Sequence, residues 1–249
     1  MNIGLYESAA SLSALERWQE AVAQNINSSE VTAYRKRATS VSAQNNGELL
    51  TDPRARVDRG EGEPAAFPVA TSTISFMPGE AKPTGRELDL AIRGPGFFAV
   101  QTPDGTRAYT RTGEFRLRPD RTIVTGQGFP VLSAAGQPIQ TLPGQGPVVI
   151  DQTGMVSQGT TQIARIALQD FANPGQLTPL SSGLYVAPEG VDPAAVAAPQ
   201  ILQGNLESSN LTSLREMVDL VTISRAYEAN QKVITSRDDL FEKTLQAFG

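Results

Sequence analysis

Acidic side chains are the residues of this chain with the best spacing for acid–base chemistry. Glu87 stands two residues before Asp89, and Asp238 is adjacent to Asp239. Paired carboxylates act as general acid and base in glycoside hydrolysis, and carboxylate oxygens also bind calcium. A carbohydrate-acting enzyme is therefore one hypothesis. Asp238 and Asp239 fall in a predicted helix, where two adjacent charges indicate a solvated face.

The chain of 249 residues has no histidine and no cysteine. This excludes zinc sites built on thiolate or imidazole, triads with a histidine base, and disulfides. The 21 Lys and Arg against 26 Asp and Glu give a net charge of -5. Nucleic-acid binders need clustered cations, so that class is disfavoured. The one basic cluster, residues 34–37, is interpreted as a solvated surface, and we expect no catalysis, no cofactor and no metal.

Residues 94–99 read Gly-Pro-Gly-Phe-Phe-Ala and formally match the dinucleotide-binding fingerprint. That fingerprint requires a helix whose first amides face a pyrophosphate. Here Phe97 begins a strand-like run, and Pro95 removes an amide from the loop. The motif therefore predicts a tight corner between two strands.

Membrane insertion and a cleaved signal peptide are both disfavoured. The longest run without charge, residues 122–150, contains five glycines and four prolines, which a membrane helix would not accept. The first seven residues lack the Lys or Arg that opens a secretory signal. We expect neither a membrane segment nor a signal peptide.

Glycine and proline divide the chain into helical ends and a different middle. All 17 prolines and 19 of the 22 glycines lie between residues 47 and 203. Near the amino end, apolar residues spaced by three and four along one seam predict a helix over residues 3–28. These residues are Leu5, Leu12, Leu15, Val22 and Ile26.

The carboxyl end carries a heptad stripe over four repeats. Ser213 and Glu216 have the spacing of a capping box, so we predict a helix over residues 213–246. At 1.5 Å per residue this helix is about 50 Å long, more than a compact domain of this size needs. Part of it then requires a partner from outside, although the helices could also pack on the middle region or on each other. The stripe consists of Leu220, Tyr227, Ile234, Phe241 and Phe248.

The middle is predicted to be antiparallel β structure in a barrel or sandwich. Its apolar runs are short and turn residues bound them. The fold class is therefore α+β, with long terminal helices forming a coiled-coil-like core domain and a central antiparallel β-rich domain. The predicted parts are an amino-terminal helix (1–40), an extended linker or arm (41–83), a β-rich outer domain (84–203) and a carboxyl-terminal helix (204–249).

Three regions, in order, resemble the flagellar rod and hook family of axial proteins. The carboxyl-terminal signature is in residues 206–210, 216–218 and 225–232, with Asp238 beyond them. The core β motif is in residues 88–100 and 109–115. The amino end departs most, since Ala33 stands where the family usually has glycine. Because a Cβ makes a left-handed backbone costly, Ala33 argues against a left-handed turn there.

The resemblance implies a structural role without catalysis. Subunits of this family pass through the flagellar type III export apparatus and stack, with copies of themselves and neighbouring axial proteins, into a hollow cylinder that crosses the periplasm and transmits torque. Its terminal helices would line the inner tube, with Asn230 joining the apolar positions above in the assembly interface. The chain length is more similar to a proximal rod protein than to a hook protein, with a distal rod protein as the nearest alternative. A free-standing β-rich binding module remains the rival from another class.

Overall fold

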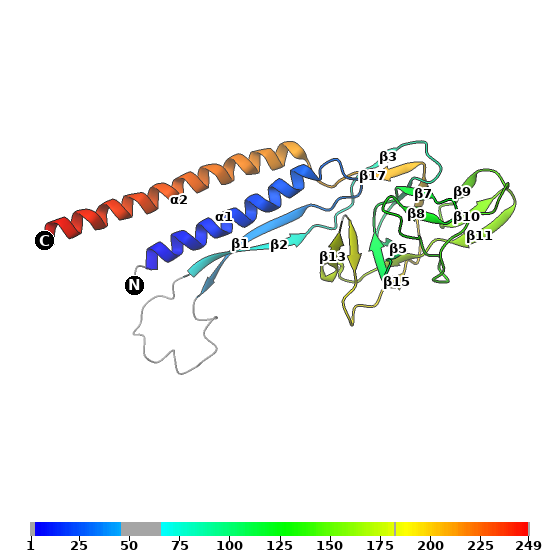
Figure 1. Cartoon of the computed structure of the whole chain (residues 1–249), viewed down its shortest axis with the longest axis horizontal. Coiled ribbons are helices and arrows are strands. Elements are labelled where there is room, and N and C mark those ends of the chain that lie inside the picture. Colours follow the sequence, from blue (N-terminus) through cyan, green and yellow to red (C-terminus); the bar gives the residue numbers. More distant parts are fainter. Residues whose placement is uncertain (1–2, 46–65, 182, 249) are drawn as a thin grey trace. The chain divides into compact units, whose positions relative to one another are not determined.

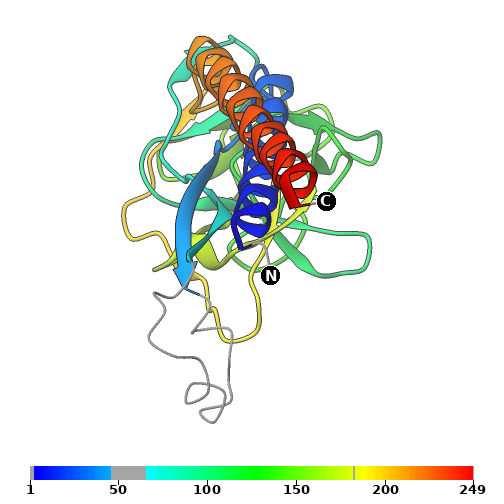
Figure 2. The same ribbon diagram turned by 90° about the vertical axis from the view of Figure 1, so that its left-hand side faces the viewer.

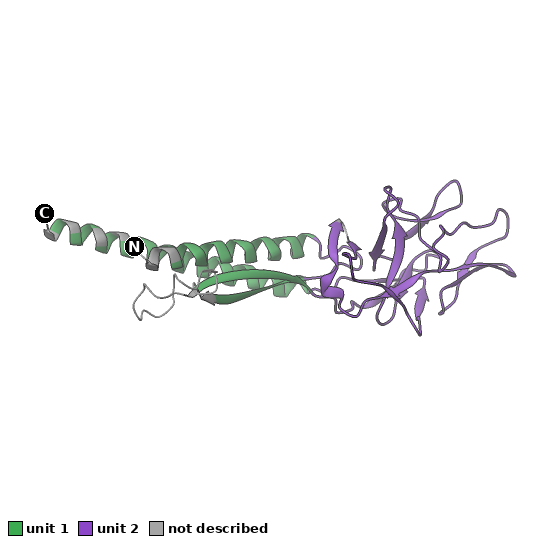
Figure 3. Cartoon of the chain, turned by 90° about the horizontal axis from the view of Figure 1, so that it is seen from below, with its two compact units in different colours: residues 1–27, 37–74, 212–249 green, residues 28–36, 75–211 purple. Residues whose placement is uncertain are grey.

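The computed structural model describes residues 3–45, 66–181 and 183–248. They form two compact units, coloured separately in Figure 3. Unit 1 contains residues 1–27, 37–74 and 212–249, and unit 2 contains residues 28–36 and 75–211. Each unit is therefore assembled from segments that are distant in the sequence. Neither terminal helix has the length and hydropathy of a membrane-spanning segment over its described residues.

Two helices and one hairpin build unit 1. Helix α1 spans Ile3–Asn27 and helix α2 spans Ser213–Phe248, which confirms the two predicted helices. Strands β1 (Arg37–Asn45) and β2 (Ala66–Ile74) pair in antiparallel register, within and beside the stretch predicted as an extended arm. Helix α1 contacts α2 on one side and the hairpin on the other (Figure 1).

The prediction that the terminal helices form a coiled-coil-like core domain is wrong. The chain is mostly β-rich, with one helix of 25 residues and one of 36. On α1 the described buried side chains are small or polar apart from Val22, among them Ala14, Ala21 and Asn25, and the helix also packs on the hairpin. The α2 stripe is only half-buried where it is described. The heptad spacing thus predicted the helices correctly and their packing wrongly. Figure 2 shows α1 and α2 from the side on which N and C are marked.

Unit 2 consists of short antiparallel strands in several small sheets. The largest has six strands in the order β13-β14-β6-β5-β12-β15, and a three-stranded sheet has the order β11-β10-β9. Pairs β16-β4, β17-β3 and β7-β8 complete the described sheets of this unit. The strand bounds in chain order are β3 Ala81–Pro83, β4 Leu90–Ile92, β5 Phe97–Gln101, β6 Arg107–Thr110, β7 Phe115–Leu117, β8 Ile123–Thr125, β9 Val148–Ile150, β10 Met155–Gln158, β11 Thr161–Arg165, β12 Leu168–Asp170, β13 Thr178–Ser181, β14 Leu184–Val186, β15 Ala194–Ala195, β16 Ile201–Gln203 and β17 Asn205–Glu207, with a 3-10 turn at Pro174–Gln176.

One hydrophobic core joins these sheets. Phe98 on β5 is fully buried and packs edge-to-face on Phe115 of β7, with ring centroids 5.1 Å apart. Leu90 and Val100 are also fully buried beside them. The predicted strands around residues 96–100, 108–110, 121–125, 146–150 and 183–186 correspond to observed strands, offset by a few residues at their ends. The run predicted as one strand over 163–168 is divided between β11 and β12, which lie in different sheets. Short, turn-bounded apolar runs were therefore a reliable signal for this unit.

Gly113 and Ala33 stand at two positions where the backbone restricts which residue fits. Gly113 lies so close to β4 that an added Cβ would be 1.7 Å from the Leu90 carbonyl oxygen, so only glycine fits there. Ala33 has φ of 54°, so the expectation that its Cβ prevents a left-handed turn is wrong. Its buried side chain and the 2.8 Å hydrogen bond from its N–H to the Glu207 carbonyl oxygen hold that conformation.

Candidate functional site

The predicted assembly residues lie on both terminal helices and differ in exposure. Val22 is buried, and Asn230 donates a hydrogen bond to the Ala226 carbonyl oxygen of its own helix at 3.1 Å. The side chains of Leu5, Phe241 and Phe248 lie outside the described part of the structure. Contact of all these residues with a neighbouring subunit stays a prediction. Half-buried members are Leu12, Leu15, Ile26, Leu220, Tyr227, Asn230 and Ile234.

Helix α2 also presents an apolar face that the sequence prediction missed. Its first and last residues are each three and four positions from the two adjacent residues between them, which places all four on one face of the helix. The exposed fractions are 72% for Leu214, 52% for Met217, 58% for Val218 and 53% for Val221. We call these four residues the exposed apolar row. The heptad count selected positions 220, 227 and 234 and passed over this neighbouring face.

Beside this row lies an open groove of about 550 Å³ within unit 1. Gln19 of α1 lines it from one side. From α2 it is lined by Leu220, Val221, Ser224 and Tyr227, so the predicted stripe and the exposed apolar row meet at its edge. A mainly apolar groove next to an exposed apolar row is an arrangement suited to binding another helix.

A buried polar contact joins the two helices of unit 1. The Asn25 side-chain amide donates to a Glu216 carboxylate oxygen at 2.8 Å and to the Arg37 carbonyl oxygen at 2.9 Å. The Arg37 N–H donates back to the Asn25 side-chain oxygen at 2.9 Å. Both Asn25 and Glu216 are almost completely buried. The sequence suggested only a helix end at Asn25 and a capping role for Glu216.

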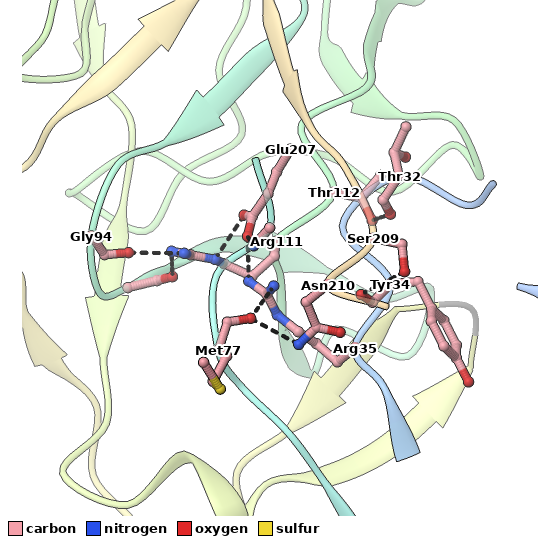
Figure 4. A network of polar contacts seen from close by, with 12 residues as sticks. Thr32, Tyr34, Arg35, Met77, Gly94, Arg111, Thr112, Glu207, Ser209 and Asn210 are labelled. Carbon is pink, nitrogen blue, oxygen red and sulfur yellow. Dashed lines mark hydrogen bonds and ion pairs between the residues drawn. The ribbon is translucent and has the colours of Figure 1, made fainter. Parts of the chain in front are cut away.

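Unit 2 contains a buried ion-pair cluster of Arg35, Arg111 and Glu207 (Figure 4). An Arg35 guanidinium nitrogen lies 2.7 Å from one Glu207 carboxylate oxygen, and Arg111 Nε lies 3.1 Å from the other. All three side chains are at most 4% exposed. The interpretation of residues 34–37 as a solvated basic surface is therefore wrong for Arg35. The carboxylate that pairs with it is 172 residues away, beyond the reach of local pattern reading.

Arg111 also closes the glycine-rich corner. Its guanidinium donates to the carbonyl oxygens of Gly96 and Gly94, the latter at 2.8 Å. Burial lowers the pKa of Arg111 from its ordinary value, and the Glu207 carboxylate offsets part of that effect. The corner lies between β4, which ends at Ile92, and β5, which begins at Phe97, and this confirms the predicted tight corner between two strands. The fingerprint match has no helix to support a pyrophosphate.

The carboxylates considered for acid–base chemistry differ in burial and in hydrogen bonding. Asp89 is buried and accepts hydrogen bonds from the Thr84 hydroxyl at 2.6 Å and from Arg86 at 2.8 Å. Glu87 is exposed, and Asp239 is exposed on α2. Among the described residues no group of three acidic, histidine or cysteine side chains is placed to hold a metal ion. Asp89 is thus held by structural hydrogen bonds, whereas Glu87 lies at the surface.

Comparison with known proteins gives a consistent family. Residues 91–158 match the flagellar hook protein FlgE/F/G D1 domain, and residues 202–247 match the flagellar basal body rod FlgEFG protein C-terminal family. The chain is 32% identical to the flagellar basal-body rod protein FlgF of Caulobacter vibrioides, covering 100% of this chain and 99% of that protein. It is 33% identical to FlgF of Rhizobium meliloti, again over 100% and 99%.

A second group of relatives has the name FlgG. The flagellar basal-body rod protein FlgG of Buchnera aphidicola is 35% identical, covering 72% of each chain. These families and relatives give no support to the hypothesis of a carbohydrate-acting enzyme. Asp89, Arg111 and Glu207, three of the residues whose buried contacts are described above, fall in the motifs that suggested the resemblance. From its sequence along its whole length, the chain belongs to the flagellar basal-body rod proteins of the rod and hook family.

Proposed function

We propose that this protein is a structural subunit of the bacterial flagellar basal-body rod and has no catalytic activity. Its subunits polymerise helically, with copies of themselves and with neighbouring axial proteins, into the hollow drive shaft that transmits torque and passes export substrates. The observation that carries the proposal is the apolar surface of α2, where an exposed apolar row borders a groove. A repeated, heterologous contact of such a surface that does not close on itself generates a filament.

The assembly interface in this proposal combines the predicted stripe with the exposed apolar row. Burying one side chain such as Ile234 against a neighbour contributes roughly 1.5 to 3 kcal/mol, and every subunit repeats the contact. The terminal segments 1–40 and 204–249 face the axis of the cylinder, and residues 84–203 form the outer part. The full-length likeness to FlgF favours a proximal rod position, with a distal, FlgG-like position as the alternative.

The same proposal extends to how the subunit reaches its place. It is exported by the flagellar type III apparatus into the basal body, where the rod crosses the periplasm. Its partners are other rod subunits and the export apparatus, and neither nucleic acid nor a membrane is among them. The net charge of -5 supports the exclusion of nucleic acid, because phosphate binding relies on clustered cations.

Replacing Ile234 by aspartate tests this proposal. A buried, unpaired carboxylate at a subunit contact costs several kcal/mol, so Ile234→Asp should abolish rod incorporation and motility in cells that depend on this subunit. Lys243→Ala, at an exposed position of the same helix, is the matched control and should change stability by a few tenths of a kcal/mol at most. Circular dichroism of the purified variants checks that unit 2 is folded. Normal swimming of Ile234→Asp cells would refute the assembly surface.

A further inference from the structure

The backbone passes between the two units at four places, which we call crossings: 27/28, 36/37, 74/75 and 211/212. On the unit 2 side, three of these crossings adjoin short segments that contain Asn210 or are hydrogen-bonded to it. They are the segments at residues 34–36, 75–77 and 208–211. Force that the backbone carries through these three crossings passes through these segments.

Asn210 ties the three segments together with its side chain. Its amide oxygen accepts from the Lys36 N–H at 2.8 Å. Its amide nitrogen donates to the carbonyl oxygens of Ser75 and Met77, each at 2.9 Å. The Asn210 N–H donates to the Tyr34 carbonyl oxygen at 3.3 Å, so both backbone and side chain are used.

The segments also bond directly to one another around Asn210. The Ser75 N–H donates to the Lys36 carbonyl oxygen at 2.9 Å, and the Ser208 N–H donates to the Glu80 carbonyl oxygen at 2.8 Å. A Cβ on Gly79 would be 1.9 Å from the Ser208 carbonyl oxygen, so these backbones are as close as they can be. The three segments are therefore in direct contact over several residues.

The buried ion-pair cluster reinforces the same three segments. Arg35 donates to the Met77 carbonyl oxygen at 2.8 Å while it pairs with Glu207. Glu207 also accepts from the Gly79 N–H at 2.8 Å. Through Arg111, the cluster is bonded to the glycine corner of the β core (Figure 4). The polar contacts thus continue from the crossings into the core of unit 2.

We propose that Asn210 is a positioning residue that makes the three crossings one cooperative clamp, so that in the rod they bear load together and not one after another. The inference rests on the proposed function and adds to it a mechanical role for Asn210, a residue of the carboxyl-terminal motif. A clamp of this kind opens as a unit because each segment bonds to the other two. If the contacts of Asn210 were merely local, their loss would free only the residues that had been bonded to Asn210.

Hydrogen exchange of the full-length protein, followed by NMR, tests the cooperativity. In Asn210→Ala, the amides of Ala33, Ser75 and Ser208 should all exchange faster, by on the order of a hundredfold for three hydrogen bonds lost. Each of these amides has its own intact acceptor, so only opening of the whole clamp exposes all three. The Leu90 amide in the β core should keep its rate and so report that unit 2 is folded. Faster exchange confined to Lys36 would overturn the clamp.

Two further variants complete the experiment. Asn205→Ala is the matched control, because Asn205 lies in β17, five residues before Asn210, and its side-chain amide donates to the Gln203 carbonyl oxygen two residues away. In this variant the three reporter amides should keep their rates. Asn210→Asp keeps an acceptor for Lys36 but has no donor for Ser75 and Met77. It should release all three segments even if Asn210→Ala fails to fold, and protection retained at Ala33 and Ser208 would again overturn the clamp.

Swimming speed in media of increasing viscosity tests the load. Cells with Asn210→Ala rods should swim normally in dilute medium and lose motility at viscosities that Asn205→Ala cells tolerate. Equal tolerance of the two variants, together with cooperative exchange in the purified protein, would overturn load sharing and leave the rod function intact. If the wild-type gene fails to restore motility to cells that lack it, the proposed function fails, and the exchange result is unaffected.

Discussion

Replacing Glu207 by glutamine removes the one carboxylate from a cluster of two buried arginines. Glu207→Gln keeps the size of the side chain and one oxygen acceptor. It deletes both ion pairs, at 2.7 Å to Arg35 and 3.1 Å to Arg111, and leaves two cations facing an amide. Because the arginine side chains are 1% and 4% exposed, water cannot replace the lost charge.

The expected cost is large relative to the stability of the unit. Removing one partner of a buried ion pair costs about 3 to 5 kcal/mol, because an uncompensated buried charge remains. A domain of this size is stable by about 5 to 15 kcal/mol. Glu207→Gln should therefore lower the folded-to-unfolded ratio of unit 2 by roughly two to three powers of ten or more.

The chain offers one signal that reports unit 1 alone and a second to which both units contribute. Trp18, on α1, is its single tryptophan, so tryptophan fluorescence follows unit 1. The near-ultraviolet circular dichroism of tyrosine has contributions from Tyr109 and Tyr185, both buried in unit 2. In urea titrations, Glu207→Gln should shift the tyrosine transition to lower urea. Glu189→Gln, an exposed site with the same change of charge, should shift neither transition. A tyrosine transition of Glu207→Gln within about 1 kcal/mol of the wild type would refute the assigned role of the cluster.

Substitutions at three other sites have defined outcomes. Gly113→Ala should destabilise unit 2 by about 2 kcal/mol or more, measured by urea unfolding, since its Cβ would be 1.7 Å from the Leu90 carbonyl oxygen. Ala33→Gly should change the free energy of unfolding by less than about 1 kcal/mol, because relief of the left-handed backbone strain offsets the lost side-chain burial and the greater entropy of the unfolded chain. Ala33→Val should instead lower the free energy of unfolding by about 2 kcal/mol or more. Equal melting temperatures of these two variants would contradict the strain argument. Burial raises the pKa of Asp151, but hydrogen bonds from Thr153 and Met155 outweigh it and hold the pKa below its ordinary value. Its contribution to stability is then present above about pH 4 and is lost as pH falls through the lowered pKa, so acid titration of Asp151→Asn should show a weaker loss of stability than the wild type.

The sequence was most informative where structure depends on local pattern. The absence of proline and the sparse glycine at both ends predicted α1 and α2, and short apolar runs between turns predicted the strands of unit 2. Gly113 belonged to a recognised motif, yet its physical reason, the approach of Leu90, appears only in the fold. Local propensity and turn chemistry act over a few residues, so they could predict individual helices and strands.

Long-range partners were beyond the same reasoning. Asn25 and Glu216 are 191 residues apart and Arg35 and Glu207 are 172 apart, so neither pair has a local signal. The heptad stripe predicted a helix but not its neighbours, which is why a coiled-coil-like core was expected where α1 also packs on a hairpin. Ala33 was misjudged because the cost of its backbone was counted without the buried contacts that sustain it.

The segmented make-up of unit 1 has a consequence for the order of events on the ribosome. Unit 2 has all its residues once residue 211 has been synthesised, whereas unit 1 needs residues 212–249 as well. At about 5 to 20 residues per second, α1 waits roughly 10 to 40 seconds between its own synthesis and that of Glu216, the partner of Asn25. Contacts between such distant segments also form slowly. The side of α1 that contacts α2 therefore finds its native neighbour only after unit 2 has been synthesised, and until then that side is available to a chaperone.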